Sequence, residues 1–199
     1  MVNFKKNKYN SLKGKFLVSS PYMNDKRFKK ALIYIISDNE NGSMGIIINK
    51  PALNISIETV LGKLEVNKSN KKNMQPKVFY GGPVELDKGF IVHTNDYKHE
   101  KDITLIGNDL ALSSNIAIIK DIISGSGPSK SIFTIGYTGW SSYQLQSEMS
   151  QNAWMEIELK NDILFSRDHK KKWEYAISKL GINPKLLNKS IFTTYTGSA

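Results

Sequence analysis

The chain has 199 residues, of which 40% are hydrophobic and 23% are charged, which is enough apolar content for one packed domain and too much for a disordered chain. Its net charge is +10, and the absence of cysteine excludes a disulfide framework, a cysteine nucleophile and a thiolate metal site. The longest unbroken apolar run is 31–36, whereas a membrane-spanning helix needs about 20 apolar residues. We therefore expect no membrane insertion and a cytoplasmic protein.

The N-terminal part of the chain predicts three strands followed by a helix. The strands cover 15–19, 31–37 and 44–49, and the Asn-Gly pair between the last two predicts a hairpin. Both strands of the hairpin are apolar at nearly every position, which indicates burial on both faces. Residues 56–65 have the apolar spacing of a short amphipathic helix.

The middle of the chain predicts four short strands. They cover 77–80, 89–94, 103–106 and 109–112, with a Gly-Gly-Pro turn after the first of them. The apolar stripe of 114–124 then predicts a helix that stops at a glycine.

The C-terminal part predicts two strands and two helices. The strands cover 131–137 and 153–159, and a capping-box pattern formed by Ser141 and Gln144 predicts that a helix runs from there to about residue 151. The last helix covers 168–180, and Gly181 followed by Ile182 predicts a Schellman stop.

These elements interleave without strict β-α alternation. We therefore expect an α+β fold with a mixed sheet in a single domain that spans 1–199, with a flexible basic segment at 1–13.

The positive charge raises the alternative of direct nucleic-acid binding. Lysines cluster at 26–30, 68–72 and 170–172. However, all but two of the 28 basic residues are lysine, whereas bidentate recognition of phosphates and bases favours arginine. Charge runs are also usually solvated faces, so nucleic-acid binding stays open but is not favoured.

Residues that carry chemistry are sparse. His93, Asp96 and His99 lie close together in the sequence, but their spacing matches no metal motif. There is no Gly-x-Ser-x-Gly nucleophile motif, and His93, at the end of a buried strand, is the one plausible general base. We therefore expect no catalytic residues, no cofactor and no metal, with an enzyme built around His93 as the alternative.

Several segments in order resemble the YqgE/AlgH family of bacterial proteins. The resemblance covers about residues 14–182. No single segment is specific alone, so the resemblance rests on all of them in order. The segments are Gly14 to Val18 with Pro21 and Met23, Met44 to Pro51, Gly81 to Val84, Gly89 to His93, Gly136 to Trp140, Gln144-Leu145 with Glu148, and Asn152 to Trp154.

The resemblance implies a compact domain in which helices surround a branched or barrel-like sheet. Members of the family are commonly labelled transcriptional regulators, and the resemblance implies no catalytic mechanism and no cofactor. The chain departs from the family pattern at Ser19-Ser20, where Ala-Met is more usual, and at 141–143, where Gly-Pro-Gly is common. If these positions shape a pocket, its ligand differs here.

The shared residues predict one ligand cleft at the ends of several strands. Glycines there let backbones approach closely and expose N–H groups, and four polar side chains are available to the same cleft. The competing interpretation is that these residues only permit tight turns and cap a helix. The predicted cleft comprises Asn49, Gly81, Gly82, Pro83, His93, Gly136, Trp140, Gln144 and Glu148.

The favoured function is that of a non-catalytic binding or regulatory protein. It would act through an unidentified partner protein or small molecule, because the full-length resemblance comes without an acid/base, nucleophile or metal constellation. The alternatives remain nucleic-acid binding through the lysine clusters and an enzyme with a cleft around His93.

Overall fold

The fold is given by a computed structural model that describes residues 9–53, 55, 77–97, 103–115 and 117–187. The helix expected at 56–65, the lysine cluster at 68–72 and His99 lie outside these residues. None of the described helices has the length and apolar character needed to cross a membrane.

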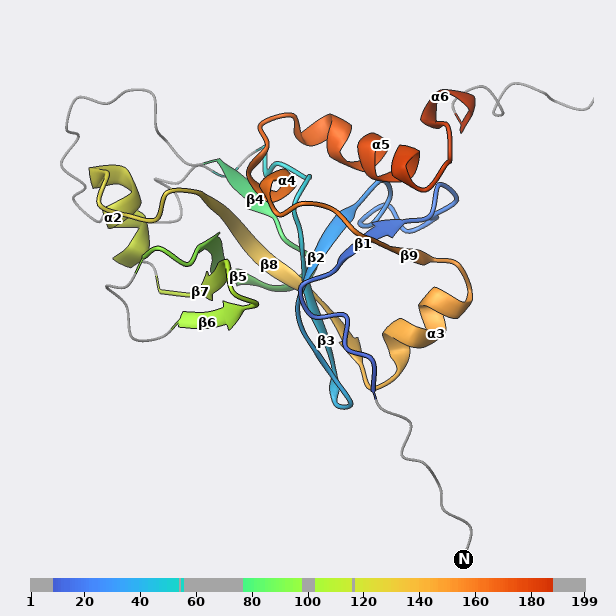
Figure 1. The fold of residues 1–199 in the computed structure, drawn as a ribbon, viewed down its shortest axis with the longest axis horizontal. Helices are drawn as coiled ribbons and strands as arrows, with labels where there is room; N and C mark the ends of the chain where they lie inside the picture. Colours follow the sequence, from blue (N-terminus) through green and yellow to red (C-terminus); the bar gives the residue numbers. More distant parts are fainter. Residues whose placement is uncertain (1–8, 54, 56–76, 98–102, 116, 188–199) are drawn as a thin grey trace, which may run out of the picture.

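The described residues form nine strands and five helices (Figure 1). The strands are β1 (Phe16–Ser19), β2 (Leu32–Asn39), β3 (Gly42–Ile47), β4 (Val78–Tyr80), β5 (Val84–Thr94), β6 (Ile103–Ile106), β7 (Leu110–Ser113), β8 (Ser131–Ser141) and β9 (Trp154–Ile157). The helices are α2 (Ala117–Ser124), α3 (Gln144–Ser150), α4 (Asp162–Phe165), α5 (His169–Lys179) and α6 (Pro184–Leu187).

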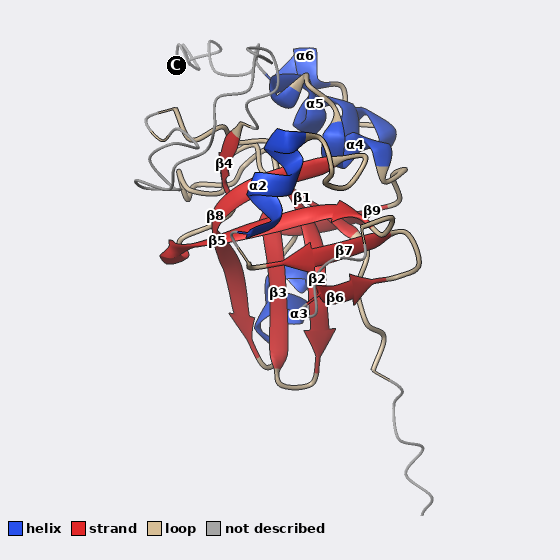
Figure 2. Ribbon diagram, turned by 90° about the vertical axis from the view of Figure 1, so that its left-hand side faces the viewer, coloured by secondary structure: helices blue, strands red, loops and turns tan. Residues whose placement is uncertain are grey.

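The strands form one curled sheet in the order β6-β7-β5-β8-β3-β2-β1-β9. All pairs along this path are antiparallel, and β4 joins β8 in parallel as a branch. Figure 2 shows that β6 and β7 run across the direction of the β2–β3 hairpin, so the sheet turns through a large angle along its width. The mixed, branched sheet with helices around it confirms the expected α+β fold.

Strand β8 is the element that connects the two halves of the sheet. Its first half pairs with β5 and β4, and its last four residues pair with β3. Gly136 lies at the register shift in the pairing with β5, between Ile135 and Tyr137, and has a φ of +65°, a conformation that favours glycine. The strand therefore changes direction at Gly136 without ending there.

Three apolar clusters occupy the faces of this sheet. The largest lies between the sheet and helices α4 and α5, and includes Tyr34 and Trp173. A second lies between β1–β3 and α3, around Trp140 and Trp154. The third lies under α2, around Ile118 and Phe133. The tryptophans are thus core residues, as their apolar spacing predicts.

Helix α5 has the ends that its sequence predicts. The Asp168 carboxylate accepts a hydrogen bond from the backbone N–H of Lys171, which caps the first turn. At the other end, Gly181 has a φ of +79° and donates to Ser178, while Ile182 donates to Ile177. This is the hydrogen-bond pattern of the Schellman motif.

Several expected boundaries were wrong, and each has a local cause. Strand β8 continues four residues beyond its expected end at Tyr137, because Gly136 bends the strand and does not stop it. Strand β5 begins at Val84, five residues early, because a register shift between Val84 and Gly89 accommodates the intervening residues. Helix α3 begins at Gln144 after Tyr143, whose φ of +57° lies outside the helical range.

Candidate functional site

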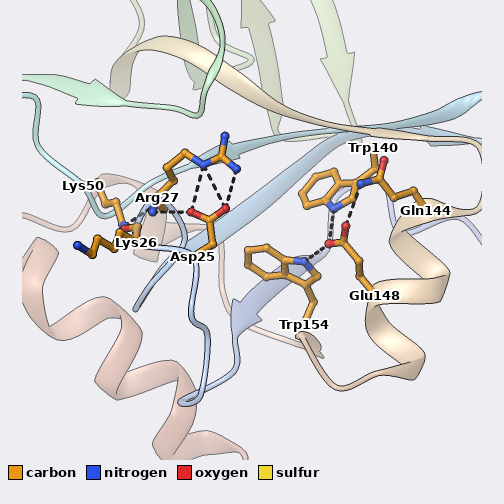
Figure 3. Close-up of polar contacts among 8 residues, drawn as sticks. All are labelled: Asp25, Lys26, Arg27, Lys50, Trp140, Gln144, Glu148 and Trp154. Atoms are coloured by element: carbon orange, nitrogen blue, oxygen red, sulfur yellow. Dashed lines mark hydrogen bonds and ion pairs between the residues drawn. The ribbon is translucent and has the colours of Figure 1, made fainter.

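One carboxylate organises the largest group of predicted site residues (Figure 3). Oxygen Oε2 of Glu148 accepts hydrogen bonds from the indole nitrogens of Trp140, at 3.0 Å, and Trp154, at 2.7 Å. Its other oxygen, Oε1, accepts from the side-chain amide of Gln144 at 2.9 Å. Hydrogen bonds to a charged acceptor are about twice as strong as neutral ones, so Glu148 holds three side chains in place.

Three elements meet at this carboxylate. Trp140 stands near the end of β8, Glu148 on α3 and Trp154 at the start of β9, and the two indole rings meet edge to face with their centroids 5.8 Å apart. Phe28 packs its ring against Trp154 in the same way. The arrangement fastens α3 to the sheet and leaves the indole N–H groups occupied.

Gln144 also explains the capping-box pattern. Its side-chain oxygen accepts hydrogen bonds from both the backbone N–H and the hydroxyl of Ser141. The glutamine half of the capping box is therefore present. The residue that flanks the helix is nevertheless Tyr143, which makes no side-chain cap, so the prediction that Ser141 opens the helix was wrong.

The predicted glycines form a second group, where two stretches of backbone cross. Gly81 donates its N–H to Ile135 and accepts from Ile47, each at 2.8 Å. A Cβ on Gly136 would lie 2.4 Å from the carbonyl oxygen of Gly82, closer than a real Cβ approaches any atom. The glycines therefore serve a close backbone crossing, with Pro83 next to it at the entry to β5.

Asn49 is bound into the backbone of its neighbours. Its side-chain oxygen accepts from the N–H of Leu32 and its amide donates to the carbonyl of Lys30, each at 2.8 Å. The side chain thereby extends the pairing between the ends of β2 and β3 by one step. Its exposed fraction is only 9%, and its hydrogen bonds are directed into the fold.

His93 is fully buried in β5. Its Nδ1 lies 2.8 Å from the carbonyl oxygen of Thr94, and because a carbonyl can only accept, Nδ1 carries the proton. Nitrogen Nε2 has no hydrogen-bond partner in the described structure. The ring meets Tyr97 edge to face, with the ring centroids 5.9 Å apart.

Seven of the nine predicted residues thus form two groups, and the other two, Asn49 and His93, belong to neither group. Trp140, Gln144 and Glu148 lie together, as do the glycines with Pro83, whereas Asn49 and His93 bond elsewhere. None of the nine residues lines the cavities of about 640 Å³ and 450 Å³ around helix α4. A ligand role for these residues stays a prediction.

The basic clusters within the described residues are partly used inside the protein. Arg27 forms an ion pair with Asp25 at 2.7 Å, and its hydrogen bonds hold the pKa of Asp25 below the ordinary value (Figure 3). Lys50 donates to the carbonyl of Arg27, and burial lowers its pKa. Lys30 lies over the ring of Trp173, which is a cation–π contact.

The histidines and acidic residues give no metal centre within the described part of the chain. No group of three or more metal-ligating side chains occurs there. Asp96, which the sequence placed near His93, instead accepts hydrogen bonds from Thr94 and from Ser129. His169 packs edge to face on Phe79, and burial, with the nearby Lys172 and Lys77, lowers its pKa to about 4.

Two buried groups were missed from the sequence. Asp38 accepts hydrogen bonds from Tyr9, Ser43 and the backbone of Leu12, and so ties the start of the described chain to the β2–β3 hairpin. Lys172 is only 2% exposed. The helical spacing could have indicated this burial, because Lys172 lies beside Trp173 and four residues before Ala176, on the inward-facing stripe of α5.

The fold and this network define a class of protein: a single-domain α+β protein in which a bent central strand joins two halves of a curled sheet. A sequence model of the AlgH-like family (DUF179) matches residues 16–185. The chain therefore belongs to the AlgH-like family.

Relatives and solved structures agree with this assignment. A UPF0301 protein of Ruegeria pomeroyi is 35% identical over 179 residues, covering 90% of this chain and 97% of the relative. One from Rickettsia prowazekii is 37% identical over 177 residues, covering 88% and 92%. The solution structure of the AlgH protein from Pseudomonas aeruginosa superposes with a TM-score of 0.73 at 31% identity, covering 98% of this chain and 100% of that one.

A more distant structure shares the fold alone. It is a protein from Corynebacterium diphtheriae with a TM-score of 0.65 and 18% identity, covering 87% of this chain and 88% of that one.

Proposed function

We propose that this chain is a cytoplasmic, non-catalytic binding protein of the regulatory kind commonly ascribed to its family. It acts by holding a small ligand or a partner protein. The cytoplasmic part of the proposal rests on the sequence, which has no cysteine and no apolar run longer than six residues.

One observation carries the proposal: apart from Nε2 of His93, the polar side chains that the sequence singles out are hydrogen-bonded within the fold. The Glu148 carboxylate accepts from two indoles and an amide, and the Asn49 amide bridges two backbone groups. A catalytic group needs a free position within about 3 Å of a reacting atom. The hydrogen bonds of Glu148 and Asn49 stabilise the fold, and this structural role is sufficient to explain why these residue types stand at these positions.

His93 is the residue on which the enzyme alternative depends. Its exposed fraction is 0%, its Nε2 has no hydrogen-bond partner, and its ring packs edge to face against Tyr97. A general base in that position has no route to a substrate without movement of the surrounding core. The nucleic-acid alternative is weakened because Lys172 is buried and Lys171 is paired with Asp168 at 2.9 Å.

A thermal-shift screen tests this proposal. The full chain is heated with organic anions, nucleotides and divalent metals, each in turn, and a true ligand held at about 100 times its Kd adds ~2.7 kcal/mol to the free energy of unfolding. We expect one chemical class to stabilise the chain without being consumed. Turnover of a stabilising compound, lost in a folded His93→Gln variant, would establish the enzyme alternative instead.

A further inference from the structure

A cavity of about 640 Å³ lies where the chain leaves β9 and passes through α4 into α5. Cavities that hold small molecules generally measure 300–1,000 Å³. Residues of both α4 and α5 line this cavity, together with residues that follow β9. A second cavity of about 450 Å³ shares the lining residues Leu159, Lys160 and Asp162 with the first, so the two cavities are adjacent.

The carboxylates in the wall of the larger cavity are already neutralised by ion pairs. Asp168 pairs with Lys171 at 2.9 Å. Glu158 pairs with Lys15 at 3.0 Å and Asp162 with Lys130 at 2.6 Å, and neither of these two lysines belongs to the wall. Each acidic group of the wall therefore has a lysine within ion-pair distance, and Asp162 also interacts electrostatically with Lys160.

Three lysines of the wall have no such partner. Within the described residues, Lys160, Lys172 and Lys179 form no ion pair at 4.0 Å or less. Lys179 instead lies over the ring of Tyr175, 5.4 Å from its centroid. The wall therefore presents an excess of positive charge beside apolar side chains, since Leu159, Ile163 and Tyr175 also line it.

Lys172 makes this excess unusual, because it is a buried cation. Its ammonium group donates to the carbonyl oxygens of Leu164, at 2.8 Å, and Ile48, at 3.1 Å, and an ammonium group has three protons to donate. Buried charges in proteins are generally paired with an opposite charge. Burial lowers the pKa of Lys172 to about 8, so the group remains mostly charged at neutral pH.

We infer that this cavity binds an amphipathic organic anion. The acidic headgroup lies beside the exposed Lys160 and Lys179, the charge of the buried Lys172 adds to the attraction, and the apolar body lies along Leu159, Ile163 and Tyr175. The inference rests on the proposed binding function and names the chemical class of the ligand and a site that the sequence did not indicate. No covalent step is involved.

Decanoate is a suitable probe, because it combines one carboxylate with a flexible apolar chain. Isothermal titration of the full chain at low salt, below the micelle concentration of the probe, measures its Kd. We expect one decanoate per chain. Decyltrimethylammonium, which has the same alkyl chain and the opposite charge, should bind at least tenfold more weakly, and inorganic phosphate, which lacks an apolar body, should also bind more weakly.

Variants locate the binding. The double substitution Lys160→Gln and Lys179→Gln removes two exposed charges from the wall without touching the core, and should weaken decanoate binding about tenfold or more. Lys170→Gln is the matched control, because Lys170 is exposed on the same helix and lies outside the wall. It should change the Kd less than twofold.

Three results would overturn the inference: no decanoate binding, equal binding of the cationic analogue, or equal loss of affinity in the Lys170→Gln control. None of them removes the proposed binding function, which survives if another class of compound stabilises the chain in the thermal-shift screen. Conversely, consumption of decanoate by the chain would overturn the proposed function.

Discussion

The indole nitrogen of Trp154 donates a hydrogen bond to Oε2 of Glu148 at 2.7 Å, and this joins the start of β9 to helix α3. The same oxygen accepts from Trp140 in β8, so one carboxylate links three elements. These residues belong to the segments by which the chain resembles its family, and the structure gives each of them an internal partner.

Glu148→Ala should reduce the free energy of unfolding by about 2–3 kcal/mol, because it leaves two buried indole N–H groups without their charged acceptor. Urea unfolding followed by tryptophan fluorescence measures the change. Glu158→Ala is the control: that side chain is 85% exposed and makes a surface ion pair, so its loss should cost less than ~1 kcal/mol. Equal effects of the two substitutions would contradict the linking role of Glu148.

Gly136→Ala should destabilise the chain by more than ~3 kcal/mol or prevent folding, because the new Cβ would meet the carbonyl oxygens of Gly82 and Val84 at 2.4 and 2.8 Å. Gly107→Ala is a matched control, since its φ of +67° is nearly the same and no atom lies within 4 Å of the added carbon. The control should cost about 1 kcal/mol, through backbone conformation alone. If both variants unfold at the same urea concentration, the close crossing of β8 is not what requires glycine.

His169 should make the chain less stable in mild acid. Its folded pKa of about 4 lies below the ordinary 6.5, so as the pH falls through this range the unfolded chain takes up the proton first and stability is lost. We expect a loss of roughly 1–2 kcal/mol between pH 6.5 and 4, discounted for partial exposure. His169→Phe, which keeps the contact with Phe79, should lack this part of the loss, and parallel curves for the two proteins would contradict the assignment.

Lys172 should have a pH dependence of the same sign, at alkaline pH. Its pKa falls from 10.5 unfolded to about 8 folded, so the unfolded chain binds more protons between these values and stability rises with pH. From pH 7.5 to 9.5 the wild type should gain about 1–2 kcal/mol relative to Lys172→Met. The exposed Lys170→Met serves as control and should follow the wild type. A Lys172→Met curve parallel to the wild type would show that the lysine titrates normally.

Local patterns in the sequence predicted the elements whose causes are local. The cap at Asp168 and the Schellman stop at Gly181 depend only on neighbouring residues, and both are present. The continuation of β8 through Gly136 was not predictable. A glycine in a strand pattern usually indicates a bend or an end of the strand, and the close contact between Gly136 and Gly82 is not visible in the sequence.

The candidate sites show the same division between local and long-range causes. The grouping of Trp140, Gln144 and Glu148 followed from motifs that lie close together in the chain. The helical spacing of α5 indicates the inward position of Lys172, but the contacts of its ammonium group with Ile48 and Leu164 are made through the tertiary fold, so the cavity beside it could not be predicted.

The most direct measurement maps ligand binding on ¹⁵N-labelled protein by amide and indole chemical shifts during a decanoate titration. Our account predicts the largest changes at Leu159, Ile163 and Tyr175, with the indole signals of Trp140 and Trp154 nearly unmoved, because their N–H groups remain on Glu148. Changes concentrated at Trp140, Gln144 and Asn49 instead would show that the family's shared residues form the ligand site and would contradict the account.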